Sequence, residues 1–139
     1  MFICDISILN RYGKQRLDEL LRELCIDWHM LVALLVVEQA PGISQARLSI
    51  FLQTDKANIS KILKSMEQRG LIQRVADPAD LRNKICYATS EGQLLAPQLW
   101  KILDLWENVC FQNIDKKDLE VFKRISNTIC QNLIKGLEM

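Results

Sequence analysis

The sequence predicts a mainly α-helical protein with one small β-hairpin in its middle third. Apolar residues recur at helical spacing through most of the chain, and N-capping residues precede several of these runs. Two short β-favouring runs flank a turn rich in Asp and Pro. With 139 residues, of which 49% are hydrophobic and 25% charged, the chain has globular composition and the length of one domain.

Two helices are expected before the middle of the chain. Residues 5–24 place leucine and isoleucine at helical spacing between charged residues, which predicts a long amphipathic helix. Asp27 is a suitable N-cap for the next run, WHMLVALLVVE, which Pro41 and Gly42 end. This apolar run is shorter than the ~20 residues that cross a bilayer, so it predicts a buried core helix.

Two short helices should follow. Ser44 is expected to cap QARLSIFLQ, and Thr54 or Asp55 to cap KANISKILKSMEQRG, which Gly70 ends. The second of these helices has an apolar stripe and carries basic and polar residues beside it. A helix-turn-helix motif has this form: the first helix supports the second, and the second offers hydrogen-bond donors to bases and phosphates.

A β-hairpin and two more helices complete the prediction. LIQRV (71–75) and KICYAT (84–89) are the expected strands, and the charged turn between them forms a wing with Arg82 near its tip. Local side-chain bonds of Asp77 and Asp80 should shape this turn, and Asp80 should also position Arg82. Ser90 is expected to cap the next helix, in which Pro97 predicts a late start or a kink. A final helix is expected over roughly residues 116–137.

Charge and cysteine usage narrow the class of protein. Residues 44–90 carry eight basic and four acidic side chains, a net charge of +4, whereas the whole chain carries +1. This distribution is expected where the middle module faces a polyanion. The cysteines are dispersed without zinc-site spacing (Cys4, Cys25, Cys86, Cys110 and Cys130), so no metal and no cofactor are expected. Unpaired cysteines, and no signal peptide or membrane span, predict a cytoplasmic protein that does not contact membrane.

The order of these elements resembles the MarR family of regulators. The segment PGISQARLSIFLQTDKANISKILKSMEQRGLIQRVADPADLRNKICYATSEG is similar to that family's helix-turn-helix and wing without a gap. The resemblance implies a homodimer, with residues 1–25 and 92–139 as dimerisation helices around a winged helix-turn-helix module at 26–91. It also implies that the two recognition helices enter successive major grooves of a pseudo-palindromic double-stranded DNA operator, with Arg82 in the flanking minor groove. Relatives often carry Arg where this chain has Lys61, so a base preference is not carried over.

Candidate site residues follow from the residues and the resemblance together. The DNA-binding set is predicted as Lys56, Asn58, Ser60, Lys61, Lys64, Arg82 and Lys84, with Arg74 as a further possible phosphate contact; the alternative is an ordinary solvated helix face. Many members of the family release DNA when a small aromatic or phenolic molecule enters the cleft between module and dimer helices. Trp28 and His29 are the candidates to line it, although the first interpretation of both is a packing role, Trp28 in the core or dimer interface and His29 partly buried at the helix start.

The leading hypothesis is a dimeric, sequence-specific DNA-binding transcriptional regulator, a repressor released by a small aromatic ligand. One alternative is a winged-helix protein-interaction module without DNA binding. Another is a cysteine-based redox-sensing regulator, for which Cys4, near the chain end, is the exposed candidate. An enzyme is not expected, because the chain has a single histidine, no glycine-rich phosphate loop and no metal-ligand cluster.

Overall fold

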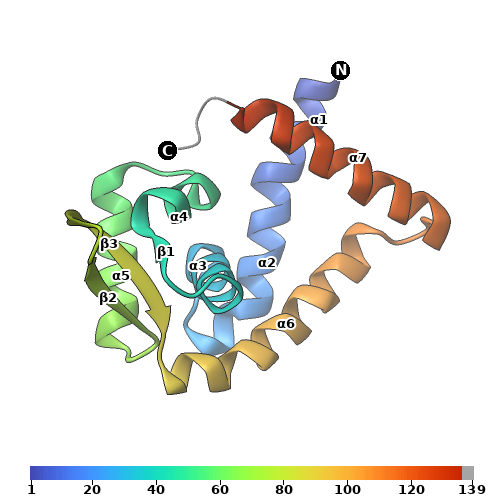
Figure 1. Cartoon of the computed structure of the whole chain (residues 1–139). Helices are drawn as coiled ribbons and strands as arrows, with labels where there is room; N and C mark the ends of the chain where they lie inside the picture. The colour runs from blue at the N-terminus through green and yellow to red at the C-terminus, as the bar shows by residue number, and fades with distance from the viewer. Residues whose placement is uncertain (136–139) are drawn as a thin grey trace.

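A buried apolar helix lies at the centre of the molecule. The computed structural model describes residues 1–135 and places α3 (Trp28–Gln39) between the other helices and the sheet (Figure 1). Asp27 caps it as predicted, its Oδ1 accepting the N–H of Met30 at 3.0 Å. Its buried side chains are Leu31, Ala33, Leu34, Leu35 and Val37. They reach α2, α4, α5, α6 and β3, so this helix is the hub of the core.

The N-terminal segment is helical from Phe2 to Leu24, as its periodicity predicted, but it is not one regular α-helix. It comprises α1 (Phe2–Ile8), a wider π-helical turn η1 (Leu9–Gly13), α2 (Lys14–Leu21) and a tight turn η2 (Arg22–Leu24). The carbonyl of Gly13, at the end of the π turn, accepts the indole N–H of Trp106 at 2.8 Å. Such turns mark a local irregularity in an α-helix, and here it brings a backbone acceptor to α6.

The predicted helix-turn-helix is formed by α4 (Gln45–Leu52) and α5 (Lys56–Gln68). Ser44 caps α4 through the N–H of Arg47, and Asp55, one of the two expected candidates, caps α5 through the N–H of Asn58 at 2.7 Å. Gly70 ends α5 in a left-handed conformation (φ 74°), as predicted. The recognition helix therefore begins and ends where its sequence indicates.

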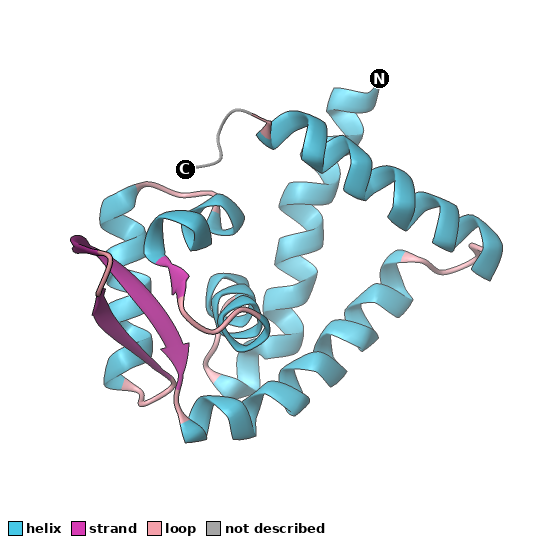
Figure 2. Cartoon of the chain, in the orientation of Figure 1, coloured by secondary structure: helices cyan, strands magenta, loops and turns pink. Residues whose placement is uncertain are grey.

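The wing is part of a three-stranded sheet. β2 (Ile72–Asp77) and β3 (Asp80–Ala88) form the hairpin, and they are longer than predicted, because only Pro78 and Ala79 lie between them. A short strand, β1 (Ile43–Ser44), pairs with β3 at Cys86 and Ile85, which gives the strand order β1-β3-β2 (Figure 2). The two-stranded prediction missed β1, since a two-residue strand has no periodicity of its own.

Two details of the C-terminal helices differ from expectation. α6 (Ser90–Cys110) is capped by Thr89, whose Oγ1 accepts the N–H of Gly92 at 3.1 Å, so Ser90 is its first residue and not its cap. α6 also continues through Pro97, so the late start is wrong. α7 (Lys116–Ile134) begins as predicted; the expected end at 137 lies outside the described residues.

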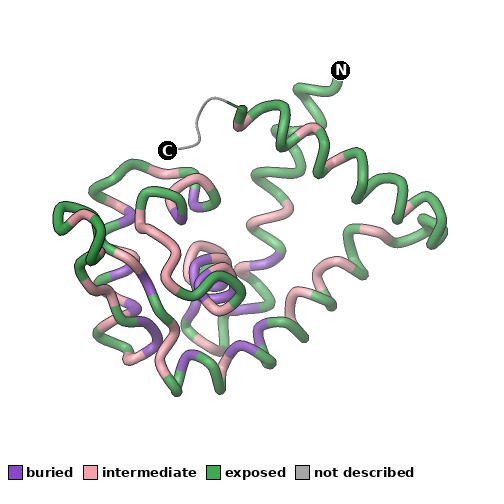
Figure 3. The backbone as a smooth tube through the Cα atoms, viewed as in Figure 1, coloured by how far each residue is buried: buried purple, intermediate pink, exposed green. Residues whose placement is uncertain are grey.

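Burial is uneven along the chain (Figure 3). Buried side chains gather in the module and in the parts of α2 and α6 beside it, whereas α1 and α7 contain no buried residue. Both nevertheless carry large apolar side chains, and Leu133 of α7 is 69% exposed. Others in these two helices are Phe2, Ile3, Ile6, Ile8, Val121, Phe122 and Ile125. Within residues 1–135, no helix has the length and hydropathy to cross a membrane.

A prediction for stability concerns Gly92, where β3 leads into α6. A Cβ on Gly92 would lie 2.2 Å from the backbone carbonyl oxygen of Leu71, so Gly92→Ala should force backbone movement. We expect it to lower the free energy of unfolding by about 1–3 kcal/mol, the usual cost of overpacking. Gly13→Ala is the matched control, because its Cβ would meet only Trp106 at 3.5 Å and its backbone is already helical. Urea denaturation measures both; equal stability of the two variants would contradict the close approach.

Candidate nucleic-acid interface and an adjoining cavity

One face of α5 projects four side chains into solvent. Ala57, Lys61, Lys64 and Gln68 are spaced by three or four residues and all are exposed, while Ile59, Leu63 and Met66 are buried on the opposite side. Lys56 and Ser60 are exposed beside this stripe. The structure thus brings four of the predicted residues onto one surface. Ala57 and Gln68 were missed, although each lies four residues from a predicted lysine.

Asn58 does not belong to this exposed stripe. It is half-buried, and its side-chain amide donates a hydrogen bond to Oγ1 of Thr54 at 2.9 Å. The contact ties the first turn of α5 to the loop before it. In this conformation Asn58 supports the helix-turn-helix turn and does not project with Lys61 and Lys64.

Arg82 stands at the tip of the wing with 90% of its side chain exposed. Asp80 positions it as predicted, accepting hydrogen bonds from its Nε at 3.1 Å and from its Nη2 at 3.3 Å. These bonds hold the pKa of Asp80 below its usual value. Asp77 also makes the expected local bond, accepting the N–H of Ala79 at 2.9 Å. Lys84 is exposed two residues beyond Arg82 on β3.

Arg74, the further possible phosphate contact, is engaged within the protein in this structure. Its guanidinium lies 2.6 Å from Glu67 and also donates to Gln45 at 3.2 Å, and only 10% of its side chain is exposed. The ion pair joins α5, β2 and α4. Arg74 therefore holds the module together.

An apolar cavity of about 470 Å³ lies between α2, α3 and α6. Its walls comprise Leu17, Trp28, Leu31, Val32, Leu35, Val36, Ala40, Trp100, Leu103 and Trp106, and its polar lining residues are Lys14 and Gln39. The indole N–H groups of Trp100 and Trp106 are bonded elsewhere, to Glu38 and Gly13. Their rings therefore present carbon to the cavity. The volume is within the roughly 300–1,000 Å³ of small-molecule sites.

The two predicted cavity residues behave differently. Trp28 lines the cavity, whereas His29 is outside the lining and stacks on Trp28 with ring centroids 3.9 Å apart. Lys14, Trp100 and Trp106 also line the cavity and were not among the predicted ligand-binding residues. Helical spacing could not reveal that three separate helices meet at this point.

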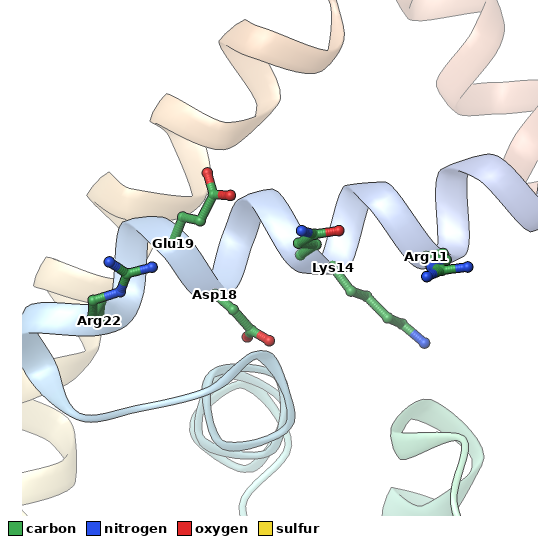
Figure 4. A pocket seen from close by; sticks show the side chains of 6 residues that line it. Arg11, Lys14, Asp18, Glu19 and Arg22 are labelled. Atoms are coloured by element: carbon green, nitrogen blue, oxygen red, sulfur yellow. The ribbon is translucent and has the colours of Figure 1, made fainter.

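A polar recess lies along α2 (Figure 4). It is lined by Arg11, Lys14, Gln15, Asp18, Glu19 and Arg22. Asp18 is directed toward α3, where its Oδ1 accepts the N–H of Trp28 at 2.7 Å. Lys14 lines both this recess and the apolar cavity, so it lies at the boundary between them.

Cys4 is exposed on α1, as expected. It was the exposed candidate from the sequence, but Cys25, Cys110 and Cys130 are exposed as well. Cys86 is buried in β3, and burial raises the pKa of its thiol to about 11. Among residues 1–135, no group of His, Cys, Asp and Glu could hold a metal ion.

Comparison with known proteins finds relatives both in sequence and in fold. Residues 27–84 match the model of the MarR family. The transcriptional regulator HosA of Escherichia coli O111:H- is 29% identical over 89 residues, which cover 64% of this chain and 66% of HosA, just under two thirds.

Solved structures extend the likeness to nearly the whole chain. A MarR transcriptional regulator from Methanosarcina mazei Go1 has a TM-score of 0.85 at 25% identity, covering 96% of this chain and 97% of that one. A putative MarR-family regulator from Listeria monocytogenes, solved with a 26mer DNA, has a TM-score of 0.84 at 20% identity, covering 96% and 89%. The chain is therefore similar to the MarR family in sequence over residues 27–84 and in fold over nearly its whole length.

Proposed function

We propose that the protein is a dimeric, sequence-specific DNA-binding transcriptional regulator, a repressor whose DNA affinity a small aromatic ligand lowers. The observation that carries the DNA-binding proposal is the exposed basic surface of Lys56, Lys61 and Lys64 with Arg82 on the neighbouring wing. Within residues 1–135 none of the three lysines forms an ion pair, so their ammonium groups are available to phosphate. The related Listeria protein was solved with DNA, which supports the same use of the fold.

The proposed domain boundaries follow the burial pattern. Residues 26–91 would form the winged helix-turn-helix module, and residues 1–25 and 92–139 the dimerisation helices. A winged-helix protein-interaction module without DNA binding is less well supported. Such a module would not require exposed, unpaired lysines on α5 together with an arginine that Asp80 holds at the wing tip.

The first test is DNA binding and its salt dependence. Footprinting on the DNA flanking the protein's own gene locates the operator. Lys64→Ala should then weaken binding to all sequences alike and flatten the slope of log K against log [salt] by about one unit, because one phosphate contact is lost. Lys101→Ala removes the same charge from an exposed site on α6 and should change neither quantity. If the two variants behave alike, Lys64 does not contact DNA.

The second test concerns assembly. Apolar side chains on α1 and α7 lie exposed at the chain ends, and a second copy would bury them. Ile125→Glu should therefore convert a dimer to a monomer in sedimentation velocity at micromolar concentration. Leu94→Glu places the same charge on an exposed apolar residue near the start of α6, away from α1 and α7, and should leave the dimer intact. A wild-type protein that sediments as a folded monomer would overturn the dimer.

The third test separates ligand from thiol control. A ligand that binds the cavity more tightly in the DNA-incompetent arrangement, by a coupling of about 1–3 kcal/mol, would lower operator affinity about 5- to 150-fold. Fluorescence anisotropy of labelled operator, with a panel of aromatic acids and with peroxide, measures this effect. If peroxide alone releases DNA, and Cys4→Ser abolishes that release, the redox-sensing alternative is correct.

A further inference from the structure

Arg69, the residue directly after α5, joins this helix to a segment that is distant in sequence. Its Nη1 donates a hydrogen bond to the carbonyl oxygen of Cys25 at 2.6 Å, and its Nη2 donates one to the carbonyl oxygen of Leu24 at 3.1 Å. Both acceptors lie at the end of η2, where the N-terminal helical segment stops before α3. One guanidinium group therefore holds the end of the recognition helix against the end of that segment.

The two carbonyl groups are natural partners for an arginine. Carbonyls at the end of a helix have no acceptor role within that helix, and they carry the negative end of its dipole. Cys25 ends the segment in a left-handed conformation (φ 53°), with its own N–H bonded to the carbonyl of Arg22. Within residues 1–135 no carboxylate lies within ion-pair distance of Arg69. The planar guanidinium fork is thus free to bond both carbonyls at once, which fixes its direction.

The other contacts of α5 hold it within its own module. α5 packs on α3, α4 and β2, and α2 lies on the other side of α3 (Figure 1). Glu67 of α5 pairs with Arg74 of β2, again inside the module. The buried side chains of α5 are apolar, and apolar contact has no preferred direction, whereas a hydrogen bond does. They are Ile59, Leu63 and Met66. Arg69 therefore supplies the directional contact between the body of α5 and the N-terminal segment.

A small tilt of α5 is large on the scale of DNA. The turn before α5 is held to α2 by the hydrogen bond from Lys14 to Gln53, so loss of the Arg69 contact would leave α5 tied at one end. The 13 residues of α5 give it a length of about 20 Å. A pivot of about 10° would move its middle, where Lys61 lies, by about 1.7 Å. In a two-fold dimer both recognition helices move, so their separation would change by up to about 3.5 Å, close to the rise of one base pair.

We propose that Arg69 is a positioning residue that sets the half-site spacing the protein accepts in its operator. It fixes the angle between α5 and the helices that form the dimer, and the separation of the two recognition helices has to match the separation of the half-sites. This inference rests on the proposed dimeric DNA-binding function. It adds a determinant of operator choice that does not touch DNA.

The test uses the operator located by footprinting and two altered operators, with one base pair inserted or removed between the half-sites. Fluorescence anisotropy should show that the wild type binds both altered operators at least about tenfold more weakly, a usual cost of one wrong position in a site. Arg69→Met should bring the three affinities to within about threefold of one another, because α5 can then tilt to meet each spacing. Arg69→Lys, with a single ammonium group in place of the fork, should give an intermediate preference.

Arg22→Met is the matched control. It removes the same charge at the same junction, and within residues 1–135 the Arg22 side chain forms no ion pair. This variant should keep the spacing preference of the wild type. Arg69→Met should stay folded by circular dichroism, because Cys25 is exposed and water can replace the guanidinium at its carbonyl.

The salt dependence of binding separates positioning from contact with DNA. Arg69→Met should leave the slope of log K against log [salt] on the original operator unchanged, because no phosphate contact is lost. A slope flattened by about one unit would make Arg69 a phosphate contact and overturn the positioning role. A wild type without a spacing preference, or an Arg69→Met variant that keeps it, also overturns the inference while the proposed function stands. A wild type that binds no operator fails before any variant is compared, so the two failures are distinguishable.

Discussion

The structure depends on burial of α3. Its buried leucines, Ala33 and Val37 belong to the core, and the helix contacts α2 and α6 as well as α4, α5 and β3. No polar side chain is fully buried in the described chain, so this core is held by apolar contact. α2 and α6 therefore share this one helix as a packing partner with α4, α5 and β3. The same helix forms one wall of the cavity.

Polar contacts also help to fix the orientation of the helix-turn-helix relative to the N-terminal segment. Arg69, at the end of α5, donates to the carbonyls of Leu24 and Cys25 at 3.1 and 2.6 Å, which joins the recognition helix to the end of the N-terminal segment. Lys14 makes the corresponding tie at the other end of the motif, through Gln53. The first tie uses backbone acceptors that cannot move away, whereas the second uses two flexible side chains.

Local sequence determined the helices, their caps and the position of the hairpin. Asp27, Ser44 and Gly70 act where they were expected, because capping depends on residues three or four positions apart. The exposed lysines of α5 were likewise predictable from a 3.6-residue period. Arg82 and its partner Asp80 are two residues apart, so their contact could also be predicted from local sequence. Within this range the sequence was sufficient to predict both structure and the main elements of the candidate DNA surface.

Contacts between distant segments were decided only by the tertiary structure. β1 exists because β3 pairs with it, and Arg74 is withdrawn from the surface because Glu67 and Gln45 meet it there. Asn58, on the flank of the exposed face, proved to bond to Thr54. The cavity, and the place of Lys14 between Trp28 and Gln53, require three helices and a turn to come together. No periodicity encodes such meetings, because they depend on how helices pack and not on the order of residues within one of them.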